Sequence, residues 1–229
     1  MNSNLFQNFK EINWLKYTIE LLVVILGVSI AFMLDNWKEN KKNIELEKNF
    51  LSSFQNDLGK DNKDLENVIS FEEKSLNELK NVIKKYAKGE EVSENELFSV
   101  FQSMLSFSFI KANNNTFEFV KNSGHLAIIK NYRLKESFVA YYQKQSEVKY
   151  LEKFQSDYVN SFFLPFLNKN FDILAQEIPN KEILNSMEMK NIITGLLVLK
   201  TQSLESTKKL ELYNSELRKD LDNELKTRF

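Results

Sequence analysis

The chain has 229 residues, of which 31 are Lys or Arg and 32 are Asp or Glu, so its formal net charge is −1 at pH 7. A charge this close to zero provides no overall field that attracts nucleic acid, and we expect no nucleic-acid partner. The sequence contains no cysteine and one histidine, which excludes disulfides, thiolate zinc ligands and cysteine nucleophiles. Only five Gly and two Pro favour long helices and an all-α fold.

Residues 1–16 form the first predicted segment. Its apolar side chains recur at the spacing of a helix that lies on a membrane surface: Leu5, Phe6, Phe9, Ile12 and Leu15. An interfacial helix and an irregular tail are equal alternatives for so short a segment.

Residues 17–37 are predicted to form a transmembrane helix. Between Tyr17 and Leu34 the only charged residue is Glu20, and at about 1.5 Å per residue this stretch covers roughly 27 Å, enough for the hydrocarbon layer. Amphipathic aromatic residues mark the expected membrane boundaries: Trp14, Tyr17 and Trp37. A small-residue cleavage site is lacking, so we interpret the segment as an uncleaved anchor. Lysines on both sides leave its orientation undecided.

One face of this helix has a distinct composition. At about 100° per residue, the acid and the small residues fall close together, and we predict a transmembrane interface formed by Glu20, Val24, Gly27, Ala31 and Asp35. Small residues four positions apart let two membrane helices approach closely, and an intramembrane acid normally faces another helix or water. A homo-oligomer is therefore expected. The alternative, in which Glu20 simply reaches the headgroups, stays open.

Residues 38–229 are predicted to form one soluble domain. The first part continues the membrane helix to Lys88-Gly89, where glycine can adopt the left-handed cap conformation. A seven-residue apolar repeat marks the buried face of this helix: Leu51, Phe54, Leu58, Leu65, Val68, Leu79, Val82 and Tyr86. Asp61, Glu72 and Ser75 interrupt the repeat. Acidic pairs such as Glu72-Glu73 are expected on solvated faces.

The rest of this domain is predicted to be helical as well. The first expected helix begins with a capping box of Ser93 and Glu96 and ends near Phe107, and a short helix follows over residues 116–121. A long helix is expected over Tyr132–Phe163, ending before Pro165. After Pro179 comes a last helix of up to about 40 residues. Because their apolar stripes can be hidden only by mutual packing, we predict an elongated helical bundle that continues from the transmembrane helix and has no β-sheet.

The segment NNNTFEFVKNSGHLAIIKNYRLKESFVAYY, residues 113–142, resembles the central part of a family of bacterial single-span membrane proteins that has no assigned activity. The anchor resembles the same family through Glu20, Gly27, Ile30-Ala31, Asn36-Trp37 and Glu39. This chain departs from the family pattern at Ile19 and His125. The resemblance implies a single-pass protein of the bacterial inner membrane, with a slight preference for a periplasmic domain, and adds no chemistry.

Two interpretations of the motif stay open. Asn side chains bond their own backbone, and a cap by Thr116 followed by a reversal at Ser123-Gly124 predicts a tight structural corner between helices. The functional alternative is a polar pocket for a small ligand. The residues concerned are the same in both cases: Asn114, Asn115, Thr116, Ser123, Gly124 and His125.

No motif in the sequence predicts catalysis. His125 is the only histidine, no Arg-x4-His pattern of helical ribonucleases is present, and no glycine-rich phosphate loop precedes a helix. We therefore expect a non-enzymatic, membrane-anchored protein without cofactor or metal, which assembles as a homo-oligomer or with a protein partner. The main alternative is an oligomeric pore or ion-conducting effector whose path is lined by Glu20. A hydrolase would need a polar cluster that the sequence does not reveal.

Overall fold

The computed structural model describes residues 14–111, 113–172, 174–175 and 177–229, so most of the predicted interfacial segment 1–16 lies outside the described residues. The helical elements, in chain order, are α1 (Trp14–Lys88), α2 (Glu94–Leu105), α3 (Asn115–Asn122), η1 (His125–Ile128), α4 (Tyr132–Tyr158), η2 (Val159–Phe163), α5 (Leu164–Asn170), η3 (Lys181–Asn185) and α6 (Met187–Arg228). Over these residues the only β pairing is a single bridge between Asp172 and Glu177. The all-α prediction is confirmed for the described part of the chain.

The chain divides into two compact units, Met1–Glu47 and Lys48–Phe229. In the first unit, α1 exposes every side chain from Trp14 to Lys42. This helix is long and apolar enough near its N-terminus to cross a membrane. The predicted boundaries at residues 17 and 37 fall inside α1, which is uninterrupted at both positions.

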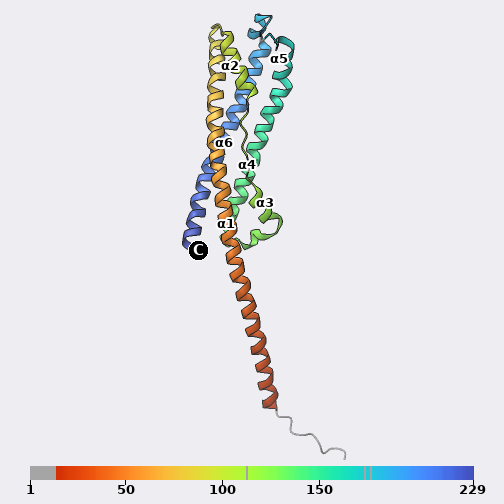
Figure 1. Cartoon of the computed structure of the whole chain (residues 1–229), viewed down its shortest axis with the longest axis vertical. Coiled ribbons are helices and arrows are strands. Elements are labelled where there is room, and N and C mark those ends of the chain that lie inside the picture. The colour runs from red at the N-terminus through yellow and green to blue at the C-terminus, as the bar shows by residue number, and fades with distance from the viewer. Residues whose placement is uncertain (1–13, 112, 173, 176) are drawn as a thin grey trace, which may run out of the picture. The chain divides into compact units, whose positions relative to one another are not determined.

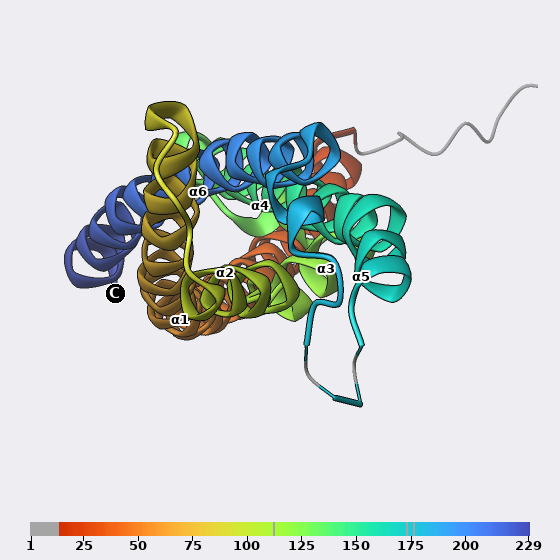
Figure 2. The same cartoon turned by 90° about the horizontal axis from the view of Figure 1, so that it is seen from above.

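The second unit is a helical bundle in which the chain reverses direction after α1, after α3 and before α6. Figure 1 shows the later part of α1 rising, α2 and α3 descending, α4 rising and α6 descending to the C-terminus. Viewed from above in Figure 2, α1, α2, α5 and α6 surround a common centre. The first two reversals use short connections, residues 89–93 and 123–131, whereas the third spans residues 171–186 and includes η3.

The ends of the first two helices follow the predicted capping signals. Gly89 has a φ of 70°, and the N–H of Glu90 donates to the Lys85 carbonyl at 3.0 Å, which closes α1 with a Schellman motif. Ser93 and Glu96 form the expected capping box at the start of α2. The helix ends at Leu105, two residues before the predicted end at Phe107.

The region around Pro165 corrects one prediction. Instead of ending before Pro165, the helical path passes through the π-turn η2 and continues as α5, in which Pro165 occupies the first turn. A proline inside an α-helix removes one N–H and clashes with the carbonyl four residues earlier. In the π-turn the N–H of Leu164 instead reaches the carbonyl of Val159, so the proline lies at a helix start where its missing donor costs little.

The core of the second unit consists of two separate apolar clusters. One surrounds Leu58 and Phe138, and the other surrounds Leu79 and Phe163. Between them, α1, α4 and α6 turn buried polar side chains inward, and we call this set the polar layer: Glu72, Ser75, Glu152, Gln155, Lys200 and Ser203. The bundle core is therefore divided across its length by buried polar groups.

Candidate functional site

A buried carboxylate on α1, that of Asp61, accepts hydrogen bonds from the motif at residues 113–142 and from α4. Asp61 is only 2% exposed. One oxygen, Oδ1, accepts from Asn113 N at 3.1 Å and from Asn113 Nδ2 at 2.8 Å, while Oδ2 accepts from Tyr141 Oη at 2.8 Å and Gln145 Nε2 at 3.1 Å. We call these four residues the Asp61 node. Four neutral donors replace the water that this carboxylate would otherwise bind.

The rest of the motif attaches next to this node. Thr116 Oγ1 donates to Asp57 Oδ2 at 2.5 Å, one turn before Asp61 on α1. The rings of Phe117 and Tyr142 stack with centroids 4.3 Å apart. The prediction that Thr116 caps α3 is wrong: Asn114 is the N-cap, and the Thr116 hydroxyl bonds to α1 instead. Asn113, Thr116 and the Tyr141-Tyr142 pair thus fasten α3 and α4 to α1.

Asn214 of α6 joins the node from the opposite side. This side chain is fully buried, and its Nδ2 donates to the Leu58 carbonyl at 3.2 Å and to Tyr141 Oη at 3.0 Å. Burial, followed by the charge of Asp61, raises the pKa of Tyr141, so its hydroxyl stays protonated and donates to the carboxylate. The node therefore links all three long helices of the bundle.

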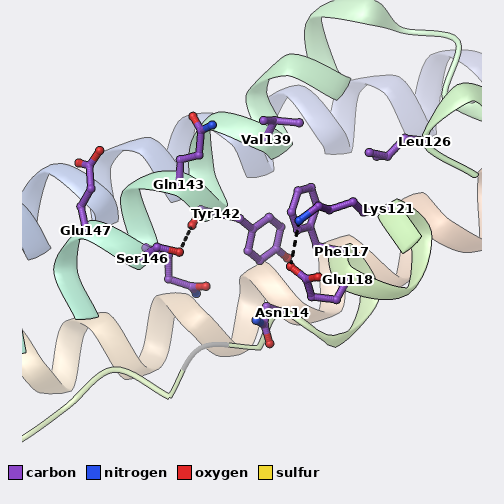
Figure 3. Close-up of a pocket in the computed structure, with 11 residues that line it drawn as sticks. Asn114, Phe117, Glu118, Lys121, Leu126, Val139, Tyr142, Gln143, Ser146 and Glu147 are labelled. Atoms are coloured by element: carbon purple, nitrogen blue, oxygen red, sulfur yellow. Dashed lines mark hydrogen bonds and ion pairs between the residues drawn. The ribbon is translucent and has the colours of Figure 1, made fainter. Parts of the chain in front are cut away.

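A groove lies beside the node, between α3 and α4 (Figure 3). Its volume is about 530 Å³, and it is lined by aromatic and aliphatic side chains with a polar rim: Asn114, Phe117, Glu118, Lys121, Leu126, Val139, Tyr142, Gln143, Gln145, Ser146 and Glu147. Figure 3 shows Lys121 and Glu118 close to the Phe117–Tyr142 stack, and the Lys121 and Glu118 charges approach to 3.7 Å. Of the six residues proposed for a polar pocket, only Asn114 lines this groove.

The other predicted corner residues make local contacts. Asn115 is exposed at the start of α3. Ser123 Oγ lies 2.7 Å from the Phe119 carbonyl and 2.7 Å from His125 Nδ1, and Gly124 has a φ of 74°. The imidazole of His125 packs 5.5 Å from the ring of Phe50. These contacts form a chain reversal of the kind that the structural interpretation describes.

The polar layer contains a buried ion pair that the sequence did not reveal. Lys200 Nζ lies 3.2 and 3.1 Å from the two carboxylate oxygens of Glu72, and the side chains are 0% and 5% exposed. Glu72 is therefore not on a solvated face, which corrects the expectation for the Glu72-Glu73 pair. The ammonium also faces the rings of Phe71 and Phe107, at 5.9 and 5.6 Å. Burial raises the pKa of Glu72 and lowers that of Lys200, and their mutual attraction opposes both shifts.

A second carboxyl of the polar layer holds the connection between α2 and α3. Residues Ser106–Lys111 are not helical and run along the bundle as a drawn-out segment, which we call the strap (Figure 1). The backbone N–H of Ile110 in the strap donates to Glu152 Oε1 at 2.8 Å. Burial raises the pKa of Glu152 to about 7; the hydrogen bond from the Ile110 N–H and the charge of Lys149 oppose this rise, and Glu72 reinforces it. Because such a segment has no ladder partners, a side chain satisfies its buried donor.

The residues predicted for the membrane all lie on the exposed part of α1. Glu20, Val24, Gly27, Ala31 and Asp35 share one face because α1 is helical throughout. Lys16 Nζ lies 3.9 Å from Glu20, one turn away, and both side chains are exposed. The boundary residues Trp14, Tyr17 and Trp37 are likewise exposed.

The comparisons with known proteins leave the family open. No protein-family model matches the chain, and no curated protein and no solved structure is significantly similar to it. Among the residues that the structure describes, no group of three or more His, Asp or Glu side chains is placed to hold a metal ion. The sequence resemblance described above therefore stays a prediction.

Proposed function

We propose that this chain is a single-span, membrane-anchored helical protein whose role is assembly, either with further copies of itself or with a protein partner, without catalysis. One observation carries the proposal: α1 exposes every side chain from Trp14 to Lys42, including a stretch apolar enough to cross a membrane. Apolar surface of this extent is stable only in lipid or against another helix.

The composition of the exposed helix supports assembly over simple anchoring. Measured from Glu20 at about 100° per residue, Gly27 and Ala31 each lie within about 20°, whereas Ser29 lies on the opposite side. Without a Cβ on Gly27, a second helix backbone can approach closely along this face. An acid on the same face is shielded from lipid when the helices pair.

A matched pair of substitutions tests this proposal. We expect Gly27→Leu to dissociate the oligomer of the full chain in mild detergent, because the leucine side chain separates the paired helices. Ser29→Leu adds the same side chain on the opposite face and should leave the mass unchanged by light scattering. Equal masses for both variants and the wild type would show that the span is only an anchor.

An oligomeric pore is the second candidate, and one observation favours it. Glu20 is the single charged residue between Tyr17 and Leu34, and a ring of such carboxylates could line a wet path. The contact with Lys16 fits the simpler alternative, in which both charges lie in the headgroup region. Liposomes that contain the purified chain distinguish these functions: leakage of a trapped dye that Glu20→Gln abolishes would favour the pore, and tight vesicles would favour assembly alone.

We place the protein in the bacterial inner membrane with a periplasmic domain, by the sequence resemblance alone. Protease treatment of spheroplasts tests this side. Residues 48–229 should be digested together with a periplasmic control protein, and their survival would place the bundle in the cytoplasm.

A further inference from the structure

The polar layer contains more acid than base. Glu72 and Lys200 neutralise each other, with Lys200 Nζ within hydrogen-bond distance of both carboxylate oxygens. Glu152 is the second buried carboxyl of this layer, at 6% exposure, and no second buried ammonium accompanies it. An ionised Glu152 therefore adds an uncompensated negative charge to the layer, whereas its neutral form does not.

The charged groups around Glu152 come from three helices. The N–H of Ile110 and Lys149 on α4 favour its ionised form, Glu72 on α1 repels it, and burial outweighs all three. Lys200 on α6 is already paired with Glu72. Lys153, with Lys149, lines a surface pocket of about 400 Å³ next to Glu152, together with Phe109, Ile110 and Ser156. The ionised carboxyl can thus leave the layer toward two lysines and solvent.

The strap depends on the same carboxyl. Ile110 is buried, and its N–H donates to Glu152 Oε1. Three residues earlier, the ring of Phe107 covers Lys200. If Glu152 turns outward, the N–H of Ile110 loses its acceptor, and a buried donor without an acceptor is costly. The strap should then open locally, because its own backbone has no ladder to hold it.

We propose that Glu152 is a proton-operated latch for the strap: when protonated it keeps the strap closed over the Glu72–Lys200 pair, and when ionised it releases the strap toward solvent. This inference goes beyond the proposed assembly function and does not depend on it. Opening exposes Ile110 and Phe107, so the protein would present additional apolar surface at the higher pH.

The direction of the pH dependence follows from the proton balance. The pKa of Glu152 is about 7 in the closed state, above the value of 4.5 for an exposed glutamate. Between these two values the closed state binds more protons than the open state, so closing is favoured at low pH and weakens as the pH rises toward 7. The opening equilibrium constant should increase about five- to sevenfold per pH unit between pH 5 and pH 7 and level off above this window.

Amide hydrogen exchange of Ile110 in the full chain in detergent micelles tests the latch. After correction for intrinsic exchange rates, we expect opening in the wild type to increase about fortyfold from pH 5 to pH 7. Glu152→Gln should remove this dependence. The control Asp157→Asn, which neutralises an exposed carboxylate on the same helix, should keep it. A pH-independent wild type, or an unchanged slope in Glu152→Gln, would overturn the proposal.

A direct titration decides the matter if Glu152→Gln does not fold. The carboxyl carbon of Glu152 can be followed by NMR in the wild-type chain. A midpoint close to pH 7, accompanied by a shift of the Ile110 amide, supports the latch. A midpoint near the ordinary value of 4.5 overturns it.

Discussion

The bundle buries carboxylates in two different ways. Asp61 is held by four hydrogen bonds from three neutral side chains and one backbone N–H, whereas Glu72 is paired with the buried ammonium of Lys200. The first arrangement fastens the motif segment to α1, and the second crosses from α1 to α6. Their responses to substitution should differ, because removal of Asp61 leaves unpaired neutral donors, while removal of Glu72 leaves an unpaired charge.

The largest loss is expected from Glu72→Gln. Because Lys200 is fully buried, its ammonium would keep its charge without a counterion or lose a proton at high cost, and we expect the free energy of unfolding to fall by about 3–5 kcal/mol. Urea denaturation of the full chain in mild detergent, followed by circular dichroism, measures this loss.

A double variant isolates the charge from the packing in this test. Replacing both partners, as Glu72→Met with Lys200→Met, should recover most of the stability, because buried ion pairs are often exchanged for apolar side chains at little cost. A double variant as unstable as Glu72→Gln would show that the layer is stabilised by more than pairing.

A smaller loss is expected from Asp61→Asn. The amide keeps one acceptor oxygen but turns an NH2 group toward donors, so at least one of Asn113, Tyr141 and Gln145 loses its acceptor, at about 2–3 kcal/mol. Asp57→Asn is the matched control, because this carboxylate accepts from Thr116 alone in the motif and should cost only about 1 kcal/mol. Equal losses in the two variants, by the same urea titration, would contradict the central role of Asp61.

Gly195→Ala tests the packing between α4 and α6 beyond the polar layer. A methyl group at Gly195 would meet the hydroxyl of Tyr158, whose Oη donates to the Asn191 carbonyl at 3.3 Å. We expect a loss of about 1–3 kcal/mol from this overpacking. Because the ring carbon Cζ of Tyr158 would also lie 2.6 Å from the methyl group, the double variant with Tyr158→Leu, which removes both atoms, should melt above Gly195→Ala. No recovery would mean that the loss does not come from the contact with Tyr158.

The smallest effect is expected at Gly59, two residues before Asp61. A Cβ at this position meets no atom within 4 Å, and α1 is helical there. Gly59→Ala should therefore stabilise the bundle by about 0.5–1 kcal/mol, because alanine lowers the conformational entropy of the unfolded chain and has a higher helix propensity than glycine. A destabilised Gly59→Ala in the urea titration would indicate that the Asp61 node needs a distortion of α1 that only glycine permits.

Local signals in the sequence predicted most helix ends, because the groups that end a helix lie within a few residues of it. Gly89, the Ser93–Glu96 box and the left-handed Gly124 all behave as their residue types predict. Pro165 did not, because the π-turn that accommodates it depends on how the chain packs.

The buried polar groups could not be predicted in the same way. Asp61 and Glu72 interrupt the apolar repeat, and that position on the buried face was the one available signal of their burial. Their partners Tyr141, Gln145 and Lys200 are 80, 84 and 128 residues away in the sequence. Neither spacing nor helix periodicity relates residues at such separations, so Glu72 was expected in solvent.

The strap also determines how the chain tolerates changes in length. Extended backbone advances about 3.3 Å per residue and a helix about 1.5 Å. A short strap therefore lets α2 and α3 together cover the same length of the bundle as the longer helices beside them. Deleting one residue from α4 would rotate everything beyond it by about 100° and turn its apolar stripe away from the core. Deleting one residue from the strap would leave the register of every helix unchanged, but it would move Phe107 or Ile110 away from its partner, Lys200 or Glu152.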